Sequence, residues 1–309
     1  MITLNTEKEL VRIESWDDIL ARPGFMPNVD PKTVKLKSII GSYTLPAEIP
    51  CGLSTCHQPH LNGYLVAAQD GLETNIGHQC GKKHFSVEFT QLRNAFTRDF
   101  NAKLRREHLW SLKHRLPSIK EELAKLKTDP LGATWIHNKI AQLLGNSGVL
   151  PRTITNEVRE ASRRGNGALV VQRKLTTEER QRLSAASDVT GLERRPRQES
   201  FTQEIVGQLE GYAALTRENS LRTILHEKLV PFIESLETSD IDSLGPKELN
   251  ALYRAGSDFD TLLDRLRSAI SQGLRLLTRR NIEQLHQFAV SPSERRMFES
   301  FSSALPAEA

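Results

Sequence analysis

Residues 51–84 read CGLSTCHQPHLNGYLVAAQDGLETNIGHQCGKKH and hold all three cysteines of the 309-residue chain. Four of the nine histidines lie in the same stretch. Three cysteines make a poor disulfide framework, because one thiol must stay unpaired. In a reducing compartment, a cluster of thiols and imidazoles is typical of a metal site, and we interpret the stretch in this way.

The ligand types in this stretch predict one structural zinc ion. A short loop that contains Gly52 lets the thiolates before and after it converge on one ion, and the third cysteine lies beyond a hairpin. Four thiolate or imidazole ligands close the tetrahedron that zinc prefers. The expected ligands are Cys51, Cys56, His60 and Cys80, with His84 as the alternative fourth ligand and His78 and His57 also open.

A β-hairpin is predicted between the cysteines, with residues 63–68 and 72–77 as strands and Asp70-Gly71 as the turn. A helix begins near Cys80, and Gly81 is expected to let backbone N–H groups turn toward its thiolate. A ligand loop, a hairpin and a helix that starts at a ligand resemble a treble-clef zinc finger over residues 51–85. The resemblance implies that the zinc stabilises the fold.

Catalytic signatures are absent from the sequence. Apart from the turn residue Asp70, Glu73 is the only acid between Cys51 and Glu88, so a zinc-bound water has few candidate bases. No HExxH, GxSxG, Walker A or GxGxxG motif occurs. We therefore expect a protein that is not an enzyme, and we disfavour a metal hydrolase.

Regions on either side of the cysteines predict different structures. Residues 1–50 are expected to form a small mixed leader, with a short helix capped by Ser15 and one or two strands that end at Pro50. Residues 51–127 join the zinc hairpin to long helices with apolar residues at helical spacing. Pro117 predicts a break and a second helix from Ser118. An antiparallel helical hairpin is favoured over a coiled coil.

Residues 128–190 predict a helix-turn-helix-like unit with a strand. Two helices, 133–144 and 151–164, are separated by a glycine-containing turn, and Gly165 ends the second helix before a strand at 168–174. This order resembles a winged helix-turn-helix. The resemblance implies that the second helix enters a DNA groove and presents Arg159 and Arg163 to it.

The remaining C-terminal sequence is expected to be helical. Residues 191–200 (GLERRPRQES) are polar and basic and predict a linker. Residues 201–290 predict a helical C-terminal domain, because apolar residues recur at helical spacing from Ile205 and Leu209 onward. A kink is expected at Pro231. The tail after Pro292 is expected to fray.

Composition favours a mainly α protein with a small zinc-bound β-hairpin unit (α+β) and elongated helical layers. Apolar residues make up 38% and aromatic residues 6% of the chain, which is lean for a compact globule and unlike a β-sandwich. No apolar run reaches the length of a membrane span, and the first residues do not resemble a secretory signal. We therefore expect a cytoplasmic protein with no membrane partner.

The distribution of positive charge suggests a function. Lys and Arg exceed Asp and Glu by 42 to 38, and residues 93–120 alone hold eight Lys or Arg and two acids. Such a run is a solvated helix face or a stripe that follows phosphates. The residues expected to contact nucleic acid are Arg98, Arg105, Arg106, Arg159 and Arg163.

Two functions fit the sequence. The first is a zinc-stabilised, non-enzymatic protein that binds nucleic acid, DNA above all. The alternative is a protein-interaction or scaffold protein whose zinc site is purely structural and whose long helices dock a partner or form a homo-oligomer.

Overall fold

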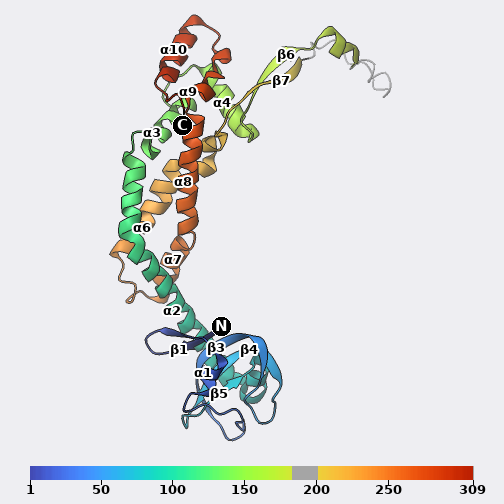
Figure 1. Ribbon diagram of the computed structural model, residues 1–309, viewed down its shortest axis with the longest axis vertical. Helices are drawn as coiled ribbons and strands as arrows, with labels where there is room; N and C mark the ends of the chain where they lie inside the picture. Colours follow the sequence, from blue (N-terminus) through green and yellow to red (C-terminus); the bar gives the residue numbers. More distant parts are fainter. Residues whose placement is uncertain (183–200, 309) are drawn as a thin grey trace. The chain divides into compact units, whose positions relative to one another are not determined.

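The computed structural model describes residues 1–182 and 201–308 and is about 55% helical, with a small antiparallel sheet (Figure 1). The expected mixture of helices with a little β-structure is confirmed. The chain divides into two compact units, one of residues 1–114 with 239–254 and one of residues 115–238 with 255–309. The predicted linker at 191–200 lies outside the described residues.

Unit 1 is built on one antiparallel sheet with the strand order β2-β1-β3-β4-β5. Residues 1–50 thus supply three strands to the sheet that also carries the cysteine hairpin. The strands are β1 (Ile2–Asn5), β2 (Leu10–Ile13), β3 (Leu36–Pro50), β4 (Pro59–Ala68) and β5 (Glu73–Ile76).

The hairpin predicted between the cysteines is confirmed. Strands β4 and β5 pair from Tyr64–Ile76 to Ala67–Glu73, and Gly71 in the turn has a positive φ of 90°. The strand before the cysteines differs from expectation, because β3 is one strand of 15 residues, with shifts in its register against β4, and not one or two short strands.

A small hydrophobic core lies on each face of the sheet, because successive side chains of a strand point to opposite faces. Leu65 packs with Ile2, Ile19 and Tyr43 on one face. The next residue, Val66, packs on the other face with phenylalanines of helix α2 (His78–Thr128). The first face is covered by α1 (Trp16–Leu20), which begins with the predicted cap, since Ser15 and Asp18 form a capping box.

The long helix α2 does not break where the sequence predicts. It continues through Pro117, and the one non-helical residue inside it is Ser86, with φ 42° and ψ −114°. The Ser118 hydroxyl donates to the Arg115 carbonyl and does not cap a new helix. Leu116 and Ile119, on either side of the proline, are buried, and their burial outweighs the one backbone hydrogen bond that a proline removes.

The expected antiparallel hairpin within residues 82–127 is therefore wrong. Segments distant in the sequence pair with this part of α2, which belongs to unit 2. Arg115 pairs with Asp260, Lys120 with Glu237, and Glu122 with Arg267, each at 2.7–2.8 Å.

The two helices and the strand predicted for residues 133–174 are confirmed as α3 (Ala133–Leu143), α4 (Arg152–Arg164) and β6 (Ala168–Lys174). The prediction of a helical domain from residue 201 is wrong at its first residues. They form a strand, β7 (Phe201–Gln208), which pairs antiparallel with β6. Ile205 is 68% exposed, so it lies on a strand surface and not on a buried helical stripe.

After β7, the elements of the described chain are all helical and are joined by loops. The tail after Pro292 is ordered, in contrast to the expected fraying, because Ser291 caps a helix that buries Phe298 and Phe301. A π-helix directly precedes the predicted kink at Pro231. The elements are η1 (Tyr212–Leu215), η2 (Arg217–Asn219), the π-helix η3 (Thr223–Leu229), α6 (Val230–Thr238), α7 (Pro246–Gly256), α8 (Phe259–Leu276), α9 (Arg279–Glu283), η4 (His286–Phe288) and α10 (Pro292–Ser303).

Replacing Gly63 with Ala is expected to destabilise unit 1. A Cβ at this strand position would lie 2.6 Å from Tyr43 Cζ and 2.7 Å from the Ile76 carbonyl oxygen. The oxygen belongs to the backbone and cannot turn aside as the end of a flexible side chain can. We expect a loss of about 1–3 kcal/mol, typical of overpacking, measured by denaturant unfolding. Asn62→Ala, at the exposed neighbouring position, is the control. Equal stability of the two variants would contradict this account of Gly63.

Candidate metal centre

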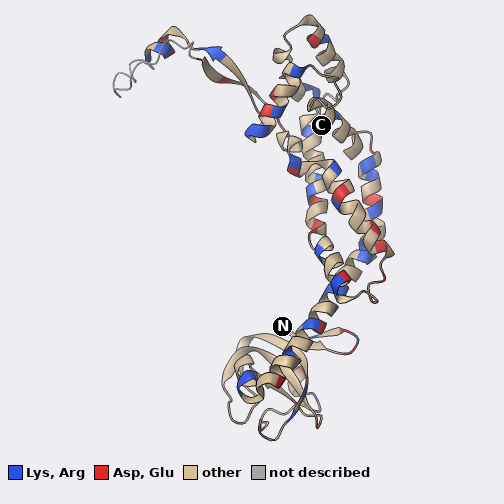
Figure 2. Cartoon of the chain, turned by 180° about the vertical axis from the view of Figure 1, so that it is seen from behind, with Lys and Arg blue, Asp and Glu red and all other residues tan. Residues whose placement is uncertain are grey.

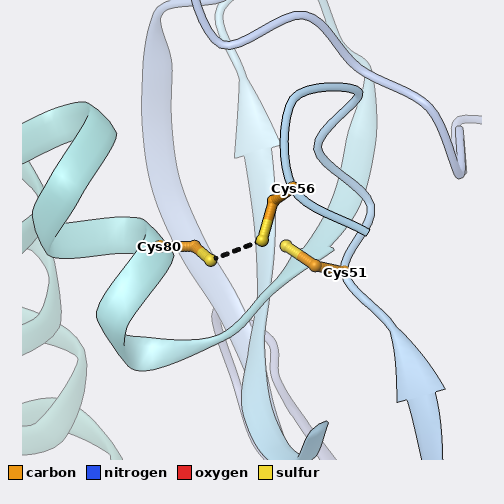
Figure 3. A group of neighbouring side chains, drawn as sticks. All are labelled: Cys51, Cys56 and Cys80. Atoms are coloured by element: carbon orange, nitrogen blue, oxygen red, sulfur yellow. Dashed lines mark hydrogen bonds between the residues drawn. The ribbon is translucent and has the colours of Figure 1, made fainter. Parts of the chain in front are cut away.

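Three segments bring the cysteines together. Cys51 directly follows β3, Cys56 lies in the loop before β4, and Cys80 lies in the first turn of α2. Their three sulfur atoms lie within 4.8 Å of one another, and the Sγ atoms of Cys56 and Cys80 are 3.0 Å apart. Figure 3 shows the three side chains pointing toward one another. The structure thus joins all three cysteines predicted as ligands.

The loop from 51 to 58 is folded tightly against β5. Gly52 donates its N–H to the Asn75 carbonyl at 2.8 Å, and a Cβ there would lie 2.8 Å from Asn75 Oδ1. Cys56 donates to the Leu53 carbonyl at 3.0 Å, which closes the turn. His57 follows with a positive φ of 51°. Gly52 therefore allows the close approach that brings Cys51 and Cys56 to one point.

Gly81 does not serve the predicted role of turning backbone N–H groups toward the Cys80 thiolate. Its N–H donates to the Gly77 carbonyl at 3.0 Å and so does not turn toward a thiolate. A Cβ on Gly81 would lie 2.6 Å from Phe89 Cε1. Eight residues of straight helix span about 12 Å, so the non-helical Ser86 is what folds Phe89 back over Gly81. The fully buried Phe89 ring thereby fixes the turn that carries Cys80.

The three thiols differ in their acidity. Burial raises the pKa of Cys51 and raises the pKa of Cys80 to about 12. A hydrogen bond from Cys80 lowers the pKa of Cys56 by stabilising its thiolate. Backbone hydrogen bonds from Leu53 and Gly77 favour the thiolate of Cys51. Three adjacent thiolates repel one another, so their joint ionisation requires a cation between them.

No histidine joins the three thiols within the part of the chain that the structure describes. Both ring nitrogens of His60 are engaged, with Nε2 2.6 Å from Tyr43 Oη and Nδ1 3.1 Å from the Gln58 carbonyl. His84 is half-buried and lies one helical turn after Cys80. His78 packs against Tyr64 and Phe89. The identity of a fourth ligand stays a prediction.

The donor set fits zinc. Tetrahedral Zn–S bonds of about 2.3 Å place sulfur atoms about 3.8 Å apart, which matches a cluster confined to 4.8 Å. Among the described residues, no carboxylate belongs to the cluster. Glu73, which with the turn residue Asp70 makes up the acids between Cys51 and Glu88, forms a two-pronged ion pair with Arg22 at 2.6 and 2.8 Å. Three soft thiolates select zinc over magnesium or calcium.

Most arginines predicted to contact nucleic acid have partners within the protein. Arg105 lies over the ring of Tyr253, and Arg106 donates to the Leu244 carbonyl. Arg159 donates to the Leu144 carbonyl at the end of α3, and Arg163 pairs with Glu160. In Figure 2, helices of the ribbon carry both blue (Lys, Arg) and red (Asp, Glu) positions.

Arg98 differs from these four arginines. It is exposed and lines an open hollow of about 840 Å³ between β4 and α2. The hollow is not predicted from the sequence, although its helical members recur at positions three and four apart, on one face of α2. The lining residues are Tyr64, Gln91, Arg93, Asn94, Thr97 and Arg98.

Comparisons with family models, curated proteins and solved structures find no match to this chain. Within the described residues, no helix has the length and apolar character needed to cross a membrane.

Zinc binding is expected to require the cysteines. Purified protein should carry about one zinc per chain, and Cys80→Ser should lose it, because two thiolates bind far more weakly than three. Elemental analysis after dialysis measures the metal. Thr55→Ala, in the same loop and exposed, should keep it. Wild-type protein free of stoichiometric metal would refute the site.

The same assay identifies the fourth ligand. Cobalt substituted for zinc gives a visible spectrum that reports the coordination number, and the ligand variant should change it. His84→Ala and His60→Ala are compared, with unfolding measured alongside, because His60→Ala also removes the hydrogen bond to Tyr43.

Proposed function

We propose that the protein is a zinc-stabilised, non-enzymatic protein that binds nucleic acid, DNA above all, through the hollow between β4 and α2. The hollow carries the proposal, since it joins two arginines, three short polar side chains and an aromatic ring. None of the residues that line it is acidic. Such a surface suits a phosphate backbone with an adjacent base.

The two arginines of the hollow remain available for a ligand. Arg98 has no ion-pair or hydrogen-bond partner within the described residues that would neutralise it. Arg93 approaches His78 at 3.4 Å and donates to Asn94 at 3.2 Å, which are both uncharged contacts while the imidazole is neutral. Other basic residues of the 93–120 run pair internally, as Lys103 does with Asp99 at 2.9 Å. Arg93 and Arg98 are thus the best supported phosphate ligands.

Tyr64 gives the hollow a flat surface for a base. Its ring meets Phe89 and Phe96 edge-on, with centroids 5.8 and 6.2 Å away, which fixes its orientation in advance. A fixed aromatic ring loses little entropy when a base stacks on it. Asn94 and Thr97 offer neutral hydrogen bonds beside it.

Zinc would shape this hollow and perform no chemistry there. Cys56 lies three residues before the start of β4, which carries Tyr64. Cys80 lies at the start of α2, which carries Arg93 and Arg98. A metal bound to both cysteines fixes the separation between the two walls. The three thiols of the cluster and the absence of a carboxylate from it, as far as the chain is described, favour a structural ion.

Recognition of DNA bases by the arginines of α4 has less support than phosphate binding by the hollow between β4 and α2. The element order α3, α4, β6 and β7 follows that of a winged helix-turn-helix. Arg159, however, donates to the Leu144 carbonyl at 2.9 Å and so closes the end of α3. We therefore assign the proposed binding to unit 1 and expect weak sequence preference.

Binding is expected to fall steeply with salt. Each phosphate contact contributes about −0.9 to the slope of log K against log salt for duplex DNA. Arg93→Ala with Arg98→Ala should weaken binding to all sequences and flatten the slope by up to about two. Fluorescence anisotropy with zinc-loaded protein at about 50 and 200 mM salt measures the slope.

A charge-matched control is Arg180→Ala with Arg296→Ala, two exposed positions of unit 2, which should leave the slope unchanged. Zinc content and circular dichroism confirm that both double variants are folded. If wild-type protein binds no nucleic acid at about 50 mM salt, where phosphate contacts are strongest, the proposal fails and the scaffold hypothesis replaces it.

A further inference from the structure

A second hollow, of about 280 Å³, lies wholly within unit 2. Its wall combines basic side chains from three elements: Lys127 near the end of α2, His137 on α3, and Arg222 and His226 at the π-helix η3. The other lining residues are small, apolar or hydroxylic: Ala133, Thr134, Leu221 and Leu225. No carboxylate lines it.

The four basic groups lack compensating acids. No ion pair joins any of them to an acid of the described residues. The neighbouring acids of α2 are engaged elsewhere, Glu121 by Lys125 and Glu122 by Arg267. Burial, followed by the charges of Arg222 and His226, lowers the pKa of His137. Lys127 and Arg222 carry like charges at the wall of one hollow, which costs free energy that a bound anion would recover.

Arg222 and His226 lie four residues apart and so share one face of this helical segment, which is a π-helix over Thr223–Leu229. Pro231 cannot donate a backbone hydrogen bond, and its ring would clash with the Glu227 carbonyl in a regular helix. The wider turn of Thr223–Leu229 relieves that clash. Ile224, Leu225 and Leu229 are buried and anchor the turn, so Arg222 and His226 are left at the surface beside His137. Such π-turns are rare and recur at functional sites.

An adjoining hollow of about 330 Å³ shares His137 and Leu221 with the first. Its wall is apolar at Ile140, Leu144 and Leu215 and polar at Asn219 and Ser220. The two hollows together have room for an anionic group and an attached organic body.

We propose that the basic hollow binds the phosphate of a small phosphomonoester, such as a nucleoside monophosphate, and that the adjoining hollow takes its organic body. Arg222 supplies paired N–H donors to phosphate oxygens, and Lys127 adds a point charge. His137, at the boundary, contacts both parts of the ligand. This site shares no residue with the hollow between β4 and α2, so it does not rest on the proposed function.

Calorimetric titration of the full, zinc-loaded chain tests the proposal. Adenosine monophosphate, inorganic phosphate and adenosine are compared in one buffer at fixed chloride concentration. We expect the monophosphate to bind more tightly than inorganic phosphate, and adenosine to bind most weakly. Arg222→Ala should weaken binding of both phosphates about tenfold or more, as expected for a lost charge-assisted contact. His226→Gln should weaken it to a smaller extent.

Lys228→Ala is the matched control, because Lys228 is an exposed cation of the same π-helix that does not line the hollow. It should leave both affinities unchanged. Equal losses in Lys228→Ala and Arg222→Ala would overturn the phosphate site, as would the absence of phosphate binding. Adenosine monophosphate that binds no more tightly than inorganic phosphate would overturn the role of the adjoining hollow.

Discussion

The convergence of three sulfur atoms within 4.8 Å marks the point at which the main parts of unit 1 meet. It joins the end of β3, the loop before β4 and the start of α2, which no continuous secondary structure connects. Around it, the fit is close enough that Gly52 and Gly81 have no room for a Cβ. A small two-faced sheet gains limited stability from its own core, so a metal bound to these thiols would contribute much of the stability of this unit.

Positive charge on α2 is divided between structure and surface. Lys113 donates to the Ser239 carbonyl, and Arg115 and Lys120 pair with Asp260 and Glu237. These contacts hold each unit's own segments against the helix, and individually they are weak because the side chains are largely exposed. A count of charges along a helix therefore overstates the charge that a ligand would meet. Only the members without internal partners, such as Arg98, retain their full attraction for an anion.

Local signals predicted much of the local structure, although the break expected at Pro117 and the new helix expected from Ser118 are wrong. The Asp70-Gly71 turn, the Ser15 cap and the Gly165 stop each depend on a few neighbouring residues, and all three occur where expected. The three cysteines also meet as predicted. Pairings between distant segments were missed, because β7 and the partners of α2 depend on contacts that no short window contains. The histidines show the same limit, since proximity in sequence to Cys56 did not reveal that Tyr43 engages His60.

The irregular Ser86 divides α2 into two helical segments that side-chain packing joins in place of one continuous helical repeat. Within a regular helix, one inserted or deleted residue rotates everything beyond it by about 100°. Across Ser86 the rotation starts afresh, because its φ of 42° interrupts the repeating geometry. Phe89, three residues beyond Ser86, packs against Gly81 and couples the two segments. A change of length between Ser86 and Phe89 would therefore disturb the turn that carries Cys80, whereas a change beyond Phe96 leaves Phe89 in place. In evolutionary terms, the long helix can gain or lose residues beyond Phe96 and not between Ser86 and Phe89.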